Sequence, residues 1–298
     1  MKNVNSDTRL SRRQWLGGVT ALAATAMDPA RRAFAQAGAA RPYRIDTHHH
    51  YTGDWTPSRA LEGMDQTGIA AAILSRPGIP VSDPEKARKL ARDTNEHGAQ
   101  LARDYPGRFG LFATLPLFDV EGSLREIAHG FDELKADGMC LVTSYGNAGY
   151  GTRWPGDPLF APVFDELNRR RAVVFIHPTV PSYYTDDFRL QSGSVRGVSG
   201  INETALENQF DTARAIVSLI INGTLIRCPF DLVRVANPAN LALLTRLMPA
   251  EHLLFGTDYP PVPISETASQ LPGLRLDGKV LRGIERDNAL TLFPRFKS

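Results

Sequence analysis

Residues 44–51 read RIDTHHHY, and three of the seven histidines of the 298-residue chain stand side by side in this stretch. In a β-strand, successive side chains point to opposite faces of the sheet. A strand here therefore predicts Asp46, His48 and His50 on one face and His49 on the other. The Cβ atoms of His48 and His50 would then lie about 6–7 Å apart, close enough for both imidazoles to bind one metal ion.

The chain around this stretch alternates between predicted strands and predicted helices. Alternating βα units from residue 43 to residue 222 favour either a (β/α)8 barrel or an open doubly wound sheet. No GxGxxG, GxxxxGK[ST] or GxSxG motif follows a strand, which argues against nucleotide-binding and serine-hydrolase versions of these folds. After the first strand, we expect further strands at 68–75, 109–117, 138–145, 172–177 and 253–258, and helices at 58–67, 83–102, 120–136, 157–170 and 202–222.

Two later strands end in polar residues that can bind metal. His177 closes the apolar run 173–176, and Asp258 closes the run that begins at Leu253. In a parallel barrel the carboxyl ends of all strands meet at one face, so His48, His50, His177 and Asp258 should converge there. Taken singly, His177 also fits a core histidine and Asp258 a helix cap. Together, three imidazoles and a carboxylate suit Zn²⁺ or a similar divalent ion and leave a position for water or substrate.

The N-terminal segment has the pattern of a twin-arginine export signal. Residues 11–16 read SRRQWL, and the Ala-rich apolar run 17–27 that follows is too short to span a bilayer as a permanent helix. Small residues at Ala33 and Ala35 predict cleavage after Ala35. We therefore expect a signal peptide of residues 1–35, one barrel domain of residues 36–298 and a periplasmic location. An amphipathic start on a cytosolic enzyme is the alternative.

The charge balance argues against a nucleic-acid partner. Residues 1–35 hold six of the 34 Lys+Arg and two of the 32 Asp+Glu, so the formal charge of +2 becomes −2 for the remainder. We find no basic stripe with interleaved aromatic residues. No other stretch approaches ~18 continuous apolar residues, so we expect no membrane association after cleavage of the signal.

Several motifs together resemble the amidohydrolase superfamily, in the branch of aminocarboxymuconate-semialdehyde decarboxylase and 6-methylsalicylate decarboxylase. They are IDTHHH at 45–50, FIHPT at 175–179 and LFGTDYP at 254–260, and stretches at 64–69, 106–110 and 157–168 agree with them. The resemblance, which runs from about Tyr43 to Pro260, implies an α/β fold of the (β/α)8 TIM-barrel type. It also implies a divalent metal, usually Zn²⁺, bound by His48, His50, His177 and Asp258. It hints at a homodimer, although the sequence shows no interface signature.

The resemblance implies a metal-dependent decarboxylase of a small aromatic carboxylic acid, similar to 6-methylsalicylate. The metal would bind the substrate carboxylate as a Lewis acid. Asp258, as the catalytic residue, would pass a proton to the ring carbon that loses CO₂. Arg153 and Trp154, in a Gly/Tyr-rich loop after the fourth strand, are candidate substrate-binding residues, although a solvated loop fits them equally. Because the same ligands can activate water, a hydrolase of a lactone or amide is the alternative.

The sequence departs from the family pattern between Gly223 and Asn240. Family members have a strand there that ends in histidine, followed by a further helix and strand, whereas here residues 230–235 run directly into an Asn-Pro stretch. No histidine occurs between His177 and His252. We therefore expect a barrel that is incomplete around its sixth and seventh strands. Losing a positioned acid–base group costs about 10²–10⁴-fold in rate, so a catalytically impaired metal binder and a poorly folding truncated product are further alternatives.

Overall fold

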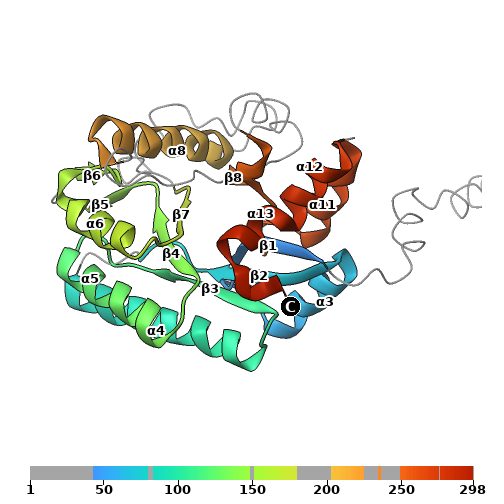
Figure 1. Cartoon of the computed structure of the whole chain (residues 1–298). Coiled ribbons are helices and arrows are strands. Elements are labelled where there is room, and N and C mark those ends of the chain that lie inside the picture. Colours follow the sequence, from blue (N-terminus) through green and yellow to red (C-terminus); the bar gives the residue numbers. More distant parts are fainter. Residues whose placement is uncertain are drawn as a thin grey trace, which may run out of the picture. The chain divides into compact units, whose positions relative to one another are not determined.

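Five parallel strands form the central sheet of the computed structural model, in the order β1-β2-β3-β4-β7. Helices follow the strands and lie around the sheet (Figure 1). This arrangement confirms the α/β class and the predicted alternation. The strands are β1 (Arg44–His50), β2 (Ile69–Ser75), β3 (Phe109–Thr114), β4 (Gly138–Val142) and β7 (Val174–His177), and the helices are α3 (Pro57–Thr67), α4 (Pro84–Asp104), α5 (Val120–Ala128), α6 (Ala161–Arg169) and α8 (Glu203–Ile221).

The structure describes residues 43–79, 83–147, 151–179, 203–224, 234–235, 249–274 and 276–297. The predicted signal peptide and the Asn-Pro stretch at 236–240 lie outside these ranges. Among the described helices, none has the length and apolar character needed to cross a membrane.

The segment that contains β9 lies beside β1 and extends the curled sheet. β9 (Leu253–Leu254) pairs in parallel with β8 (Arg234–Val235). Beyond β9, the N–H of Thr47 donates to the Phe255 carbonyl at 3.0 Å, and the N–H of Asp258 donates to the His48 carbonyl at 2.8 Å. The parallel strands therefore follow the order β8-β9-β1-β2-β3-β4-β7, which is most of a barrel.

The predicted gap falls between β7 and β8. In the described part of the chain between them there is one helix, α8, and no strand. Four apolar residues of α8 are exposed: Phe210, Val217, Ile220 and Ile221. In a complete (β/α)8 barrel each helix of the outer ring has a neighbouring helix on either side. The exposed apolar side of α8 therefore agrees with a barrel that lacks a βα unit after this helix.

The helix ends follow from local sequence signals. The side chain of Thr56 caps α3 by accepting from the N–H of Arg59. Gly68, with φ +72°, ends the same helix because glycine adopts the left-handed conformation without a steric cost. Asp83 caps α4 in the same way as Thr56 caps α3.

Other boundaries differ from the sequence-based expectation. The loop predicted after the fourth strand is an antiparallel hairpin of β5 (Tyr145–Asn147) and β6 (Gly151–Arg153). β4 ends at Val142, whose N–H donates to the hydroxyl of Tyr145 at 2.9 Å instead of to a neighbouring strand. The helix predicted at 120–136 is α-helical to Ala128 and continues as a π-turn over His129–Glu133.

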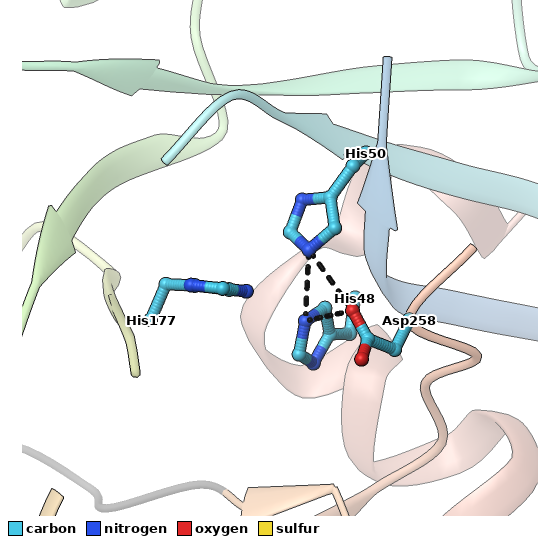
Figure 2. A group of neighbouring side chains, drawn as sticks. All are labelled: His48, His50, His177 and Asp258. Atoms are coloured by element: carbon cyan, nitrogen blue, oxygen red, sulfur yellow. Dashed lines mark hydrogen bonds and ion pairs between the residues drawn. The ribbon is translucent and has the colours of Figure 1, made fainter. Parts of the chain in front are cut away.

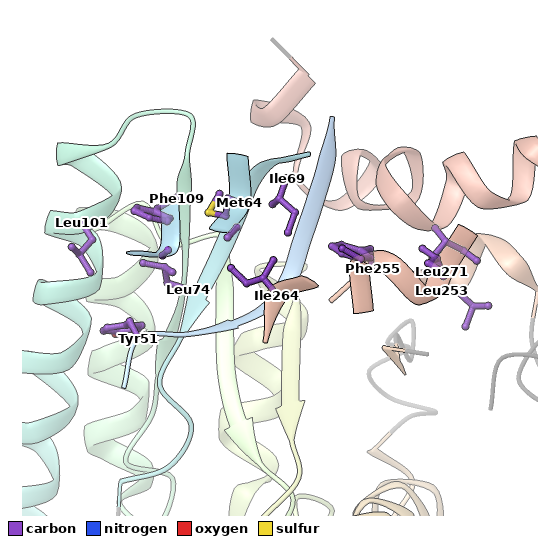
Figure 3. Packing of buried hydrophobic residues seen from close by; sticks show 14 residues of the cluster. Tyr51, Met64, Ile69, Leu74, Leu101, Phe109, Leu253, Phe255, Ile264 and Leu271 are labelled. Carbon is purple, nitrogen blue, oxygen red and sulfur yellow. The ribbon is translucent and has the colours of Figure 1, made fainter. Parts of the chain in front are cut away.

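A buried apolar cluster joins the two ends of the domain (Figure 3). Met64 from α3 and Phe109 from β3 belong to it, together with Phe255 and with Ile264 of α11 (Ile264–Gln270). Both Met64 and Phe109 are fully buried. Packing of Phe255 and Ile264 against residues of α3 and β3 therefore holds the segment around Asp258 close to β1.

Met64→Ala should lower the free energy of unfolding by about 2–5 kcal/mol, because it leaves a cavity in this cluster. The exposed Gln66, on the same helix, is the matched control, and Gln66→Ala should change stability by less than about 0.5 kcal/mol. Urea unfolding of both variants measures the difference. Equal stabilities for the two would show that the cluster does not hold α3 in place.

Candidate metal centre

Three segments that are distant in the sequence bring four side chains together (Figure 2). His48 and His50 come from β1, His177 from the end of β7, and Asp258 from the segment after β9. One ligand-type atom from each residue lies within 4.8 Å of the other three. The Nε2 atoms of His48 and His50 are 3.1 Å apart, and Asp258 Oδ1 lies 3.2 Å and 3.1 Å from them. The imidazole of His177 faces this group, with its centroid 4.7 Å from that of His50.

Ser75, the last residue of β2, determines which nitrogen of His50 carries the proton. Its carbonyl oxygen and its Oγ lie 3.3 Å and 2.9 Å from His50 Nδ1, and its hydroxyl donates to the His49 carbonyl. A carbonyl can only accept, and the serine proton is already used, so Nδ1 of His50 is the donor. The Nε2 lone pair of His50 then faces His48 and Asp258. This is the tautomer that a metal ligand requires.

Asp46 connects β1 to the segment that carries Asp258. Its fully buried carboxylate accepts from the N–H of His48 at 3.1 Å, from the N–H of Thr257 at 3.0 Å and from the Thr257 hydroxyl at 2.6 Å. A buried carboxylate needs such donors, because leaving it without partners is costly. The backbone at His48 and the residue before Asp258 are thus fixed by one side chain.

The expectation that Asp46 shares a face with His48 and His50 is wrong. Its carboxylate contacts His49 Nδ1 at 3.0 Å, and Trp55 Nε1 donates to the other nitrogen of His49 at 3.1 Å. Because an indole N–H can only donate, Nδ1 of His49 carries the proton and donates to Asp46. The pairing of β1 with β2 shifts register between Asp46 and His49, which interrupts the simple alternation of side chains.

Asp258 occupies an uncommon backbone conformation on the accessible side of the group. Its φ is +59°, in the left-handed region, where non-glycine residues cost of order 1–3 kcal/mol and are frequent at functional sites. The N–H bond to the His48 carbonyl holds it there. The side chain of Asp258 is 41% exposed, against 4% for His50. A ligand would therefore reach the centre from the side of this carboxylate.

The surroundings favour the protonation states that metal ligands need. Burial lowers the pKa of His50, and burial with the neighbouring imidazoles lowers the pKa of His177 to about 3. Burial alone would raise the pKa of Asp258, but the neighbouring imidazoles of His48 and His50 outweigh it and hold this pKa well below its usual range. At neutral pH, His50 and His177 are neutral and Asp258 is ionised.

The donor set fits a divalent metal ion. Three imidazoles and one carboxylate are the ligand types of Zn²⁺ and similar ions, and the exposed side leaves a position for water or substrate. The lone pair of His50 Nε2 faces the ionised Asp258 Oδ1 at 3.1 Å. Two acceptors so close together repel each other, and a cation between them removes this repulsion.

The candidate substrate-binding residues make contacts within the protein. Arg153, the last residue of β6, forms an ion pair with Asp157 at 2.7 Å. Trp154 Nε1 donates to Asp211 Oδ1 at 2.9 Å. Both lie in or just after the β5–β6 hairpin, which follows the carboxyl end of β4. Their role in substrate binding stays a prediction.

Sequence reasoning missed the residues that hold the centre in place. Ser75 ends an apolar strand with a polar group, the same signal that identified His177 and Asp258, so it could have been found. Thr257 carries no such signal, because its partner Asp46 is distant in the sequence and only the fold shows the contact.

A family model described as amidohydrolase matches residues 45–233. The match begins within β1 and covers His48, His50 and His177. The chain belongs to the amidohydrolase family. It is therefore an enzyme of this family, and Asp258 lies beyond the matched segment.

Relatives of this amidohydrolase include fungal decarboxylases. The chain is 30% identical to the 6-methylsalicylic acid decarboxylase acuB of Aspergillus aculeatus, over 85% of this chain and 97% of the relative. It is also 30% identical to the decarboxylase yanB of Aspergillus niger, over 85% and 88% of the two chains. The first alignment runs over 342 residues, more than the 298 of this chain, so the relative has segments without a counterpart here.

Solved structures confirm that the amidohydrolase has a TIM-barrel fold. A dihydroxybenzoic acid decarboxylase from Polaromonas sp. JS666, solved with manganese and 2-nitroresorcinol, superposes with a TM-score of 0.75 at 19% identity, over 86% of this chain and 98% of the other. A 2,6-dihydroxybenzoate decarboxylase bound to 2,6-dihydroxybenzoate gives a TM-score of 0.72 at 18% identity, over 85% and 99%.

The metal-free amidohydrolase should lose stability as the pH is lowered through the weakly acidic range. An unfolded histidine titrates near 6.5 and the folded His177 near 3. Between these values the unfolded chain binds a proton that the native protein does not, so the free energy of unfolding falls as pH falls. Urea unfolding at pH 7 and pH 5 measures the loss. His177→Asn removes the titrating group and should reduce the slope; an unchanged slope would contradict the assignment.

Proposed function

We propose that this amidohydrolase is a metal-dependent decarboxylase of a small aromatic carboxylic acid similar to 6-methylsalicylate. The observation that carries the proposal is the convergence of His48, His50, His177 and Asp258 within 4.8 Å at one accessible site. Similarity to fungal decarboxylases over most of both chains supports the reaction and the substrate class.

The metal, the three histidines and Asp258 have different tasks in this proposal. A divalent ion held by the four side chains supplies Lewis acidity toward the substrate carboxylate and an adjacent oxygen. We propose Zn²⁺, because histidine-rich sites of this kind suit it. His48, His50 and His177 form the buried side of the centre, and Asp258 stands on the side that a substrate would approach.

Asp258 is the proposed proton carrier. Because its pKa is lowered, it is a carboxylate at neutral pH and must first accept a proton, which the phenolic hydroxyl of the substrate can provide. Asp258 then gives this proton to the ring carbon that bears the carboxylate. The carbon–carbon bond breaks, CO₂ leaves, and the bonding electron pair returns to the ring. The resulting phenolate takes a proton from water.

Chelation of the metal should abolish CO₂ release from 6-methylsalicylate, and added Zn²⁺ should restore it. Asp258→Asn should lower kcat by about 10²–10⁴-fold, because the amide cannot carry the proton. His252→Gln, outside the centre, is the control and should retain activity. Activity that survives complete removal of the metal would contradict the proposal.

Other outcomes of the same experiment identify the alternatives. Turnover of lactones or amides without CO₂ release from hydroxybenzoates would indicate a hydrolase. A protein that binds one equivalent of metal but turns over neither hydroxybenzoates nor lactones and amides would be an impaired metal binder. The absence of any histidine between His177 and His252 agrees with this alternative.

We also propose export to the periplasm by the twin-arginine route. Replacing Arg12 and Arg13 by lysine should keep the protein in the cytoplasm of a bacterial host, whereas the unchanged chain should be recovered in the periplasm beginning at Gln36. Fractionation and N-terminal sequencing check both points. The homodimer also stays a prediction, which light scattering of the purified protein tests.

A further inference from the structure

Thr143 makes two hydrogen bonds, one as donor and one as acceptor, that hold the backbone at His177 and just after it. Thr143 directly follows β4, and its N–H donates to the carbonyl of His177 at 2.9 Å. Two residues later, the N–H of Thr179 donates to Oγ1 of Thr143 at 2.9 Å. Thr143 is fully buried, so neither bond competes with solvent. The direction in which His177 leaves the end of β7 therefore depends on this threonine.

The hydroxyl of Thr143 donates a hydrogen bond to the side chain of Asp211, on α8. Asp211 is fully buried, and its two carboxylate oxygens accept from the hydroxyl of Thr143 and from the indole of Trp154. A hydroxyl rotates freely unless its proton has a partner. The bond to Asp211 fixes this rotation and turns a lone pair of Oγ1 toward the N–H of Thr179.

We propose that Asp211 is a positioning residue for the metal ligand His177 and acts on it through Thr143. The inference rests on the proposed metal-binding function and adds a residue from α8 to it. α8 is the last described helix before the shortened region of the barrel. The side chain of Asp211 thus links the metal centre to the docking of this helix. Partners that orient ligands in this way typically contribute 10–100-fold to metal affinity.

Isosteric substitutions separate this role from plain packing. Thr143→Val keeps the shape of the side chain but removes the hydroxyl, and Thr143→Ser keeps the hydroxyl but removes a methyl group. Asp211→Asn keeps the shape of the carboxylate, but its amide offers one acceptor oxygen where two donors arrive. A packing role would make Thr143→Ser the more harmful variant, because only serine changes the shape of the side chain. A positioning role makes the serine variant the harmless one.

Ser218 provides a matched control on the same side of α8. It accepts from the N–H of Gly156 at 3.0 Å and donates to the carbonyl of Ala215, so it docks the helix without touching Thr143. Ser218→Ala should loosen this docking to a degree similar to Asp211→Asn and leave His177 oriented.

Competition between the purified full chain and a chromophoric chelator for Zn²⁺ measures the affinity directly, without any substrate. We expect Thr143→Val and Asp211→Asn to weaken Zn²⁺ binding by about 10–100-fold, and Thr143→Ser and Ser218→Ala to weaken it by less than about threefold. Thermal unfolding of the metal-free variants reports their folding separately.

Equal affinities of Thr143→Val and Thr143→Ser, or an unchanged affinity of Asp211→Asn, would overturn the inference while leaving the proposed function intact. An unmodified chain that binds no Zn²⁺ or other divalent ion would overturn both. An unmodified chain that binds metal but releases no CO₂ would overturn only the decarboxylase activity, and the affinity series would still decide the role of Asp211.

Discussion

The parallel contact between β1 and the segment after β9 is the constraint on which the site depends. It brings Asp258 next to His50 although 208 positions separate them in the sequence. Asp46 secures this contact, because its buried carboxylate bonds both the backbone at His48 and the Thr257 side chain. Burying a carboxylate costs free energy unless donors surround it. The donors that satisfy Asp46 belong to two of the three segments that carry ligands, so satisfying it also brings His48, His50 and Asp258 together.

A second layer of polar residues orients the histidines. Ser75 fixes the tautomer of His50, and Thr143 holds the backbone around His177. These residues lie at or just after the carboxyl ends of β2 and β4, beside the strands that carry the ligands. The parallel barrel thus supplies both layers from one face. This arrangement places Asp258 in an unfavourable left-handed backbone conformation, which the surrounding contacts maintain.

The sequence allowed the site to be predicted where strand periodicity and strand ends carry the information. His48, His50, His177 and Asp258 were found in this way, and the structure brings their ligand atoms together. The predicted orientation of the Asp46 side chain was wrong, because a register shift depends on the partner strand and leaves no local signal in the sequence. Asp211 lies within a helix, where a single aspartate normally faces solvent, and only tertiary packing shows that it is buried. The missing histidine and the shortened connection between residues 223 and 240 predict an incomplete barrel from the sequence.

The central claim is that one divalent ion binds among these four side chains. A crystal structure of the purified protein, with diffraction recorded at the absorption edge of the bound metal, tests this most directly. The account predicts a single strong anomalous peak in contact with imidazole nitrogens of His48, His50 and His177 and with a carboxylate oxygen of Asp258. A protein prepared with metal that shows no peak there, or a peak at another site only, would contradict it.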